Sequence, residues 1–454
     1  MDDELPLGWV WARLYDLCDV HDTERLPIKR EDREIRCAGK ELSALYPYYG
    51  ATGRAGLIDD FRSEGPAILL GEDGAPFLER DRPKAYGVSG RYWVNNHAHI
   101  LRVRDLRYGQ YLLHYLNYVD YSHLVTGTTR LKLTLDALRK MQICVAPPSE
   151  AERIGSEIDH LFGSLDEAEA ALERAREGLT QYRASLLHAA CTGALTAEWR
   201  KTNKPKETGA DVPALPASWR WCKLGDVISD GPMNGLSPPT SSDEGGSIGL
   251  KLTATTSGTF DLSKHCLKRL SVKVDPGSRF FLSNGDLVFQ RGNTREYVGM
   301  AAIYCGPPNT YVFPDLMIRV RMSDNKLAEW VWRYANSPLG RHYFQETASG
   351  TAGSMPKING RVLREMPIAI PPPEERVHIL GILDALIAGH NDNWRTLDEV
   401  EAQNARLRQS ILHAAFAGRL VPQDPTDEPA STLLARLRAA PTAPRRRARL
   451  TRRV

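Results

Sequence analysis

The chain has 454 residues, enough for roughly two to four domains, and its 42% hydrophobic and 25% charged residues are typical of a globular protein. It contains no apolar run of about 18 residues, which excludes a membrane-spanning helix, and its acidic start lacks a signal-peptide core. Seven scattered cysteines without a CxxC pair indicate reduced thiols, a cytoplasmic location and no zinc site. The formal charge of +3 neither requires nor excludes nucleic acid.

The two halves of the chain open in the same way. Residues 5–20 read LPLGWVWARLYDLCDV and residues 215–230 read LPASWRWCKLGDVISD, with two tryptophans at equal spacing after a shift of 210 (215 − 5). Residues 185–195 (SLLHAACTGAL) return as residues 410–420 (SILHAAFAGRL) after a shift of 225 (410 − 185). These pairs predict an internal duplication. The second half therefore has about fifteen extra residues, which we expect in a Gly/Ser/Pro-rich loop at 231–249.

Each half begins with a globular segment of mixed elements. Short β-rich runs bounded by Gly, Pro or Asn predict strands at 100–105, 285–290, 300–305 and 317–322. Aromatic-rich helices are predicted at 108–121 and 326–344, the second interrupted near Pro338. Because βαβ regularity is missing, we predict α+β domains with a mainly antiparallel or mixed sheet.

A long helix follows each globular segment. A proline pair precedes it in both halves, and Ser149 with Glu152 has the spacing of a capping box. Gly193 and Gly418 are suitable helix ends. Each helix would be roughly 60 Å long at about 1.5 Å per residue.

Apolar residues at four-three spacing predict a coiled-coil seam along both helices. The seam residues are Ile158, Leu161, Leu165, Leu172, Leu179, Leu186, Leu383, Leu386, Leu397, Val400, Leu407 and Ile411. An antiparallel pair between two domains related by a pseudo-two-fold axis is the simplest closed arrangement, and a parallel pair is less economical. His390, Asn393 and Asn404 interrupt the second seam. They either set the register at a cost in stability or face water or another subunit.

Signatures of catalysis are missing. The sequence has no GxGxxG after a strand, no GxxxxGK[ST], no HExxH and no Asn-Pro-Pro-aromatic motif. GGSIG at 245–249 matches GxSxG, but it lies in the predicted loop rather than between a strand and a helix. His97 and His99 would face the same side of a strand, where packing or hydrogen bonding is favoured over a metal because no third ligand is evident.

Four glycine-containing polar loops, at 46–56, 125–133, 289–299 and 349–360, carry hydroxyl, amide and cationic side chains. Such groups bind phosphates, and Arg and Asn also read guanine and adenine through paired hydrogen bonds. Ordinary surface turns are the alternative for each loop taken alone. The candidate DNA-binding residues are Tyr48, Tyr49, Gly50, Thr52, Arg54, Thr128, Thr129, Arg130, Lys132, Arg291, Asn293, Thr294, Arg295, Ser354, Lys357 and Asn359.

These features resemble the specificity subunit of type I restriction-modification enzymes. The resemblance rests on the LPxxWxW openings, on Pro-Pro-x-Glu at 147–150 and 372–375, and on the repeated helix endings. GDLVFQRGNT (285–294) and LVPQDPTDEPASTLLARLR (420–438) also look like that family. The first half departs from the pattern, because ILLGEDGAP (68–76) stands where the family carries a strand and an arginine-bearing loop.

The resemblance implies two target recognition domains, each reading one half of a split, asymmetric site on double-stranded DNA. The helices would be spacers that dock two modification (methyltransferase) subunits, and restriction subunits would join that complex. The chain itself would hold no cofactor or metal, whereas S-adenosylmethionine, ATP and Mg would belong to the partners. The implied divisions are domain 1 at 1–148, spacer 1 at 149–196, a linker at 197–214, domain 2 at 215–373, spacer 2 at 374–421 and a tail at 422–454.

Two other functions remain open at this stage. A stand-alone DNA methyltransferase would bind S-adenosylmethionine by itself, and a coiled-coil scaffold would have no DNA role. In the tail, residues 431–438 are a candidate short helix. The arginines from 445 to 453 are either a solvated segment or a weak nonspecific DNA contact.

Overall fold

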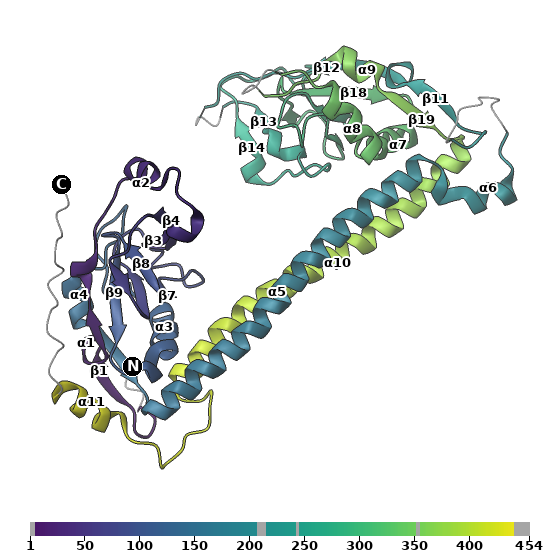
Figure 1. Ribbon diagram of the computed structural model, residues 1–454. Helices are drawn as coiled ribbons and strands as arrows, with labels where there is room; N and C mark the ends of the chain where they lie inside the picture. Colours follow the sequence, from purple (N-terminus) through teal and green to yellow (C-terminus); the bar gives the residue numbers. More distant parts are fainter. Residues whose placement is uncertain (1–4, 207–214, 242–244, 351–354, 440–454) are drawn as a thin grey trace. The chain divides into compact units, whose positions relative to one another are not determined.

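The computed structural model describes residues 5–206, 215–241, 245–350 and 355–439 (Figure 1). The chain divides into two compact units. The first unit contains Met1–Leu172 and Asp398–Val454, and the second contains Glu173–Leu397. Within the described ranges, no helix is both long and apolar enough to cross a membrane.

A four-stranded antiparallel sheet forms the centre of the first unit, in the order β2, β9, β6, β7. Its strands are β2 (Cys18–Val20), β6 (Ala67–Gly71), β7 (Ala85–Val88) and β9 (Ala98–Val103). All five residues of β6 are buried, as expected for an uninterrupted apolar run at the middle of a sheet. Helix α3 (Gly109–Tyr118) packs against β6 and β7.

The remaining elements of the first unit surround this sheet. β1 (Val10–Arg13) pairs with β10 (Gln142–Val145), and a second sheet has the order β4, β3, β8, β5. The strands of that second sheet are β3 (Tyr46–Gly50), β4 (Gly53–Ile58), β5 (Ser63–Glu64) and β8 (Arg91–Val94). The short helices are α1 (Leu14–Leu17), α2 (Arg30–Cys37), α4 (Leu135–Lys140) and α11 (Ala430–Ala439). Helix α11 contacts α1, so the end of the described chain completes this unit (Figure 1).

The second unit repeats the plan. β11 (Arg220–Lys223) pairs with β19 (Pro367–Ile370), and the main sheet has the order β12, β18, β15, β16. These strands are β12 (Ile228–Asn234), β15 (Leu287–Gln290), β16 (Ala301–Ile303) and β18 (Met317–Met322). A further sheet contains β13 (Ile248–Leu250), β14 (Leu267–Arg269) and β17 (Tyr311–Val312). The helices are α6 (Ala197–Asn203), α7 (Asn325–Ala335), α8 (Pro338–Thr347) and α9 (Gly360–Glu365).

Equivalent hydrogen bonds confirm the duplication. The Leu14 N–H donates to Met141 O at 3.1 Å, and the Leu224 N–H donates to Met366 O at 2.8 Å. In the first unit the Asn117 amide accepts from the Ala85 N–H and donates to Ala85 O. Asn336 makes the same two bonds to Ala301 in the second unit. The predicted α+β fold with two pseudo-symmetric domains is therefore confirmed.

Most predicted elements are present. The four predicted strands are β9, β15, β16 and β18, and the helix predicted at 108–121 is α3. The interruption near Pro338 separates α7 from α8, with Pro338 in the first turn of α8. The prediction of a loop throughout 231–249 was wrong at both ends, since β12 extends to Asn234 and β13 begins at Ile248. β12 is an edge strand with two register shifts, and such irregular edge pairing tolerates Gly231 and Pro232.

The long helices are α5 (Pro148–Cys191) and α10 (Pro373–Phe416). Within each unit, segments of the two helices pair antiparallel. In the second unit His390 Nε2 lies 3.1 Å from Leu179 O, and in the first unit Arg408 forms an ion pair with Asp166. The predicted helix start was one residue late, because α5 begins at Pro148 and Ser149 therefore lies inside its first turn.

Both predicted glycine ends follow the long helices. Gly193 and Gly418 have φ of 79° and 65°, the left-handed conformation common just after a helix. The segment predicted as a linker from residue 197 instead begins with α6, and residues 207–214 lie outside the described residues. The short helix predicted at 431–438 is α11, whereas the arginines from 445 to 453 also lie outside the described residues.

The seam is narrower than predicted. Ile158 and Leu383 are fully buried, and Leu186 is 7% exposed. Leu161, Leu165, Leu172, Leu179, Leu397 and Ile411 are half-buried. Leu386, Val400 and Leu407 are exposed, so these three assignments were wrong. A strict 3.5-residue repeat drifts around a helix of 3.6 residues per turn, and the buried positions are accordingly Ile387 and Leu412, one residue later than the predicted Leu386 and Ile411.

The three polar seam residues separate into two kinds. His390 and Asn404 are 8% and 6% exposed, whereas Asn393 faces solvent. Asn404 Nδ2 has no hydrogen-bond partner among the described residues. The burial of His390 and Asn404 fits residues that set the register of the helix pair. The exposure of Asn393 fits the other alternative, a residue that faces water or another subunit.

Candidate nucleic-acid interface

In each unit one predicted polar loop lies against the end of a central strand. In the first unit Glu72 follows β6, and its carbonyl accepts from the Leu133 N–H at 2.7 Å. In the second unit Arg291 follows β15, and its carbonyl accepts from the Ile358 N–H at 2.8 Å. Isolated bridges join Asp73 to Lys132 and Gly292 to Lys357. The loop at 125–133 thus lies against the end of β6, as residues 355–360 lie against the end of β15.

These contacts align the two strand ends residue by residue. Glu72 and Arg291 make the same backbone bond, and the residues that pair with them, Leu133 and Ile358, differ by the shift of 225 found in the sequence (358 − 133). A carboxylate therefore occupies the position that a guanidinium occupies in the other unit. The backbone is repeated, but the chemistry presented at the strand end is inverted.

Ion pairs neutralise the basic loop of the first unit. Arg130 Nη2 lies 3.0 Å from Asp73 Oδ1, and Lys132 Nζ lies 3.0 Å from Glu72 Oε1. Both basic side chains remain accessible, with exposed fractions of 59% and 48%. Burial acts to raise the pKa of Glu72, but hydrogen bonds from Arg25 and Lys132 outweigh it, and the pKa is lowered overall. Glu72 is therefore a charged anchor for this loop.

The histidines predicted to pack or form hydrogen bonds do so. His99 is fully buried, with Nδ1 2.7 Å from Asp22 Oδ2 and Nε2 3.0 Å from Leu133 O. Asp22, Glu72 and His99 come close enough together to resemble a cation site. The Arg25 guanidinium already lies 3.1 Å from Asp22 and 2.5 Å from Glu72. This cluster is satisfied by a side-chain cation.

The hairpin at 46–56 contains both buried and accessible candidates. Tyr48 is 2% exposed, its hydroxyl accepts from the Ile28 N–H, and Arg33 stacks on its ring. Its assignment to DNA binding was wrong, because its position on a central strand turns it into the core. Tyr49 packs between Tyr86 and Tyr92.

The tip of this hairpin is more accessible. Gly50 is buried, and its carbonyl accepts from the Tyr86 hydroxyl, so its assignment to direct DNA contact was also wrong. Thr52 and Arg54 are exposed at the tip. Thr128 and Thr129 are likewise exposed in the neighbouring basic loop. These four residues keep the accessibility that a DNA contact requires.

In the second unit the 289–299 loop is partly used for its own fold. Asn293 Nδ2 donates to Gln290 Oε1 at 2.5 Å, and Asn293 Oδ1 accepts from the Thr294 N–H. Arg295 Nη1 donates to Gln345 O at 2.6 Å. Arg291 is half-buried, with Nη1 directed to Asp315 O at 3.4 Å. Thr294 and Arg295 are exposed.

The last predicted loop gives mixed results. Lys357 is exposed beside Gly292. Asn359 is the N-cap of α9, where its Oδ1 accepts from the N–H groups of Arg361 and Val362. Its side-chain oxygen therefore has a structural role at the start of α9. Ser354 lies outside the described residues.

The acidic pair Glu72 and Asp73 also lies at this interface and is not among the residues predicted from the sequence. Their signal is present, because EDG (72–74) directly follows the buried apolar strand β6 just as RGN (291–293) follows β15. The partnership with Arg130 and Lys132 spans about sixty residues, however, and depends on tertiary contacts (130 − 73 = 57; 132 − 72 = 60).

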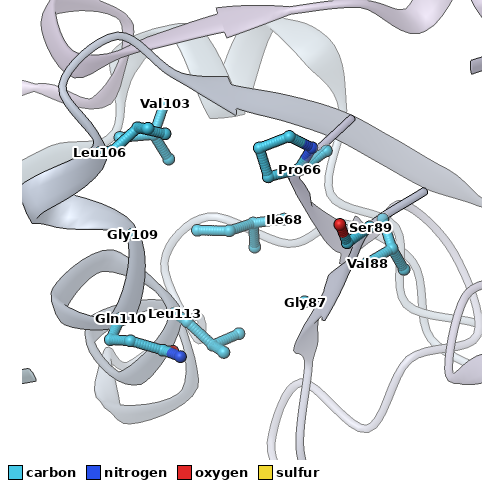
Figure 2. A pocket seen from close by; sticks show the side chains of 11 residues that line it. Pro66, Ile68, Gly87, Val88, Ser89, Val103, Leu106, Gly109, Gln110 and Leu113 are labelled. Carbon is cyan, nitrogen blue, oxygen red and sulfur yellow. The ribbon is translucent and has the colours of Figure 1, made fainter. Parts of the chain in front are cut away.

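A separate apolar cavity of about 510 Å³ lies between the main sheet and α3 of the first unit (Figure 2). Ile68 and Leu113 point into it, and Gly87 leaves one wall without a side chain. In the second unit Trp332 takes the place of Leu113, four residues before the equivalent asparagine. Trp332 Nε1 donates to Gly258 O, which brings the 258–262 segment over this side. The apolar lining does not suit nucleic acid, so the interface remains at the strand ends.

The chain is similar to known proteins over most of its length. Residues 6–174 match the family described as type I restriction modification DNA specificity domain. The EcoKI specificity subunit of Escherichia coli K12 is 24% identical over 337 residues, which are 73% of this chain and 69% of that protein. The EcoDI specificity subunit of Escherichia coli is 22% identical over 442 residues, covering 94% of this chain and 92% of that protein.

A solved structure supports the fold. It belongs to work on complex assembly and conformational transition of the type I restriction-modification system, and it has a TM-score of 0.61 at 19% identity. The match covers 92% of this chain and all of that one. The fold of both units is therefore similar to that of this solved structure. Residues 6–174 match the family model, and the chain is similar to type I restriction-modification specificity subunits over most of its length.

Proposed function

We propose that this chain is the non-catalytic DNA-recognition subunit of a type I restriction-modification complex. Each unit would contact one half of a bipartite, asymmetric target on double-stranded DNA. One observation carries the proposal: the same backbone framework ends in Glu72 and Asp73 in one unit and in Arg291 and Gly292 in the other. Equivalent scaffolds with different end groups suit two different half-sites.

The catalytic chemistry would belong to partner chains. Two modification subunits would bind S-adenosylmethionine and methylate adenine N6, which requires the base to leave the stack. Restriction subunits would use ATP and Mg. The family resemblance supports these partners and a cytoplasmic location in a bacterial or archaeal cell. The long helices would set the number of unread base pairs between the two half-sites.

Footprinting of the complex of this chain with its modification subunits tests the proposal. We expect protection of two short sequences separated by a constant gap. Absence of sequence-dependent protection would leave the scaffold function instead. Calorimetry of the isolated chain with S-adenosylmethionine tests the methyltransferase alternative, and saturable binding there would contradict a non-catalytic role.

A further inference from the structure

Arg130 in the first unit is an exposed arginine held in one orientation. Its Nη2 lies 3.0 Å from Asp73 Oδ1 and 3.5 Å from His97 Nδ1. His97 Nδ1 in turn lies 2.5 Å from the same Asp73 oxygen. The Arg130 side chain is 59% exposed, although its Nη2 is held by Asp73.

The backbone around Arg130 is also fixed. Thr126 and Lys132 exchange two backbone hydrogen bonds, at 3.0 and 2.8 Å, which close the hairpin that carries Arg130. The Gly74 N–H donates to Leu131 O at 3.3 Å. Gly74 has a φ of 72°, and a side chain there would begin 3.4 Å from Arg130 Nε. The guanidinium of Arg130 therefore lies in van der Waals range over the loop that follows β6.

The equivalent place in the second unit has a different side chain. Residue 355, which is 225 positions after Arg130, is a methionine, and it is 46% exposed. Its sulfur lies 3.2 Å from where a side chain at Gly292 would begin. Arg130 in the first unit and Met355 in the second thus both lie over the loop that follows the central strand. Only the first unit places a charged hydrogen-bond donor there.

The carboxylate changes what Arg130 binds best. Asp73 offsets the positive charge of the guanidinium, which weakens its attraction to phosphate. The guanidinium has five N–H donors, and the contacts of Arg130 with Asp73 and His97 both use Nη2, so further donors remain for a planar acceptor pair. In the major groove, guanine O6 and N7 form such a pair.

We propose that Arg130, oriented by Asp73, reads a guanine in the half-site contacted by the first unit. Arg130 is the specificity-determining residue, and Asp73 is a positioning residue that acts through it. Lys132, a point charge beside Glu72, contacts the backbone rather than a base. The inference rests on the proposed DNA-recognition function, and it adds the base class and the residue that reads it.

The test uses the complex of the full chain with its modification subunits on a library of duplexes randomised in both half-sites. The wild-type complex must first select two half-sites with a fixed gap; failure at this stage would contradict the proposed function and not the assignment of Arg130. With wild-type selection established, Arg130→Ala should relax one guanine position in one half-site by roughly 10- to 100-fold. Selection in the other half-site should be unchanged.

Two further variants distinguish base reading from charge. Arg130→Lys keeps the charge but loses the planar donor fork, so it should relax the same guanine position. Asp73→Asn should relax the same guanine position, and it should also release the Arg130 guanidinium from its ion pair. The salt dependence of nonspecific DNA binding should then steepen by a slope of about 0.9. A merely structural role of Asp73 would leave that slope unchanged.

Arg139→Ala is the matched control, because Arg139 is 56% exposed and paired with Asp136 as Arg130 is paired with Asp73. It should leave the selected sequence as in the wild type. The inference is overturned if Arg130→Ala leaves every position unchanged. It is equally overturned if Arg130→Ala weakens all sequences to the same degree, since that result assigns Arg130 to a phosphate.

Discussion

The ends of β6 and β15 are built on one backbone plan and carry opposite charges. Glu72 and Arg291 accept equivalent backbone hydrogen bonds from Leu133 and Ile358, yet one side chain anchors a neutralised loop and the other is a half-buried cation. The framework and the groups it presents therefore vary independently. A duplicated protein of this kind can acquire two specificities without changing its fold.

The contacts that join each globular part to its long helix also keep their place but change their chemistry. His114 Nε2 lies 2.7 Å from Asp159 Oδ1 in the first unit, and Arg333 Nη2 lies 2.7 Å from Asp384 Oδ1 in the second. The two aspartates are 225 positions apart (384 − 159). The acceptor is retained while the donor changes, so these positions conserve a contact rather than a residue type.

The largest effect is expected from shortening one helix only. Deletion of residues 166–172 from α5 removes one heptad. The same face of α5 then stays buried, but the rest of the helix moves by about 10 Å along α10. We expect a changed gap between half-sites or loss of the methyltransferase complex. Methylation mapping and size-exclusion chromatography measure these outcomes, with the exposed Ala171→Ser variant as control. An unchanged gap with full activity would contradict the spacer role.

A second prediction concerns Glu375, the buried carboxylate at the start of α10. Glu375 is fully buried and receives hydrogen bonds from Thr196 at 2.7 Å and Arg200 at 2.5 Å. Arg200→Met would leave the buried charge without its cation, and we expect a loss of about 3–5 kcal/mol in the free energy of unfolding. Urea denaturation measures it, and the added substitution Glu375→Gln should restore most of the loss. A loss below about 1 kcal/mol would show that this pair does not hold the unit together.

The third prediction compares two asparagines of α10. Asn404 is buried with an unpartnered amide nitrogen, whereas Asn393 is exposed. Asn404→Leu should raise the free energy of unfolding by about 1–2 kcal/mol, because an unpaired buried amide is replaced by an apolar side chain. Asn393→Leu should change it by less than about 0.5 kcal/mol. Equal effects of the two substitutions would contradict the burial that separates them.

A smaller, pH-dependent effect is expected at Glu150, the first-unit counterpart of Glu375. Burial raises its pKa above the usual 4.5, and hydrogen bonds from Trp9 and Gln423 oppose the shift only in part. The folded state then binds the proton more tightly than the unfolded state. The stabilisation that Glu150 contributes to the folded state is fully present below pH 4.5 and declines as the pH rises toward and through the raised pKa.

Glu150→Gln removes this titration and retains an acceptor for the Trp9 indole, which donates at 3.0 Å. The stability difference between the variant and the wild type should therefore change across weakly acidic pH, in favour of the variant as the pH rises. Glu152→Gln at the exposed neighbouring position is the control. A pH-independent difference for Glu150→Gln would contradict the raised pKa.

Local patterns in the sequence predicted the duplication, the central strands and the helix ends, because these depend on residue spacing and on Gly and Pro. The seam was predicted less well, since the 3.5-residue repeat selected Leu386 where the helix buries Ile387. Tyr48 and Asn359 were assigned to an interface by residue type alone, but one lies in the core and the other caps a helix. The ion pairs of Asp73 with Arg130 and of Glu72 with Lys132 could be recognised only from the fold, which brings these residues together.

The central claim is that the two units read two different half-sites as one target. A map of N6-methyladenine in the host genome, compared with a strain lacking this chain, tests it most directly. We predict one bipartite motif that depends on the chain, with two dissimilar half-sites, a constant gap and a methylated adenine in each half. A palindromic or continuous motif, or a methylation pattern unchanged without the chain, would contradict the claim.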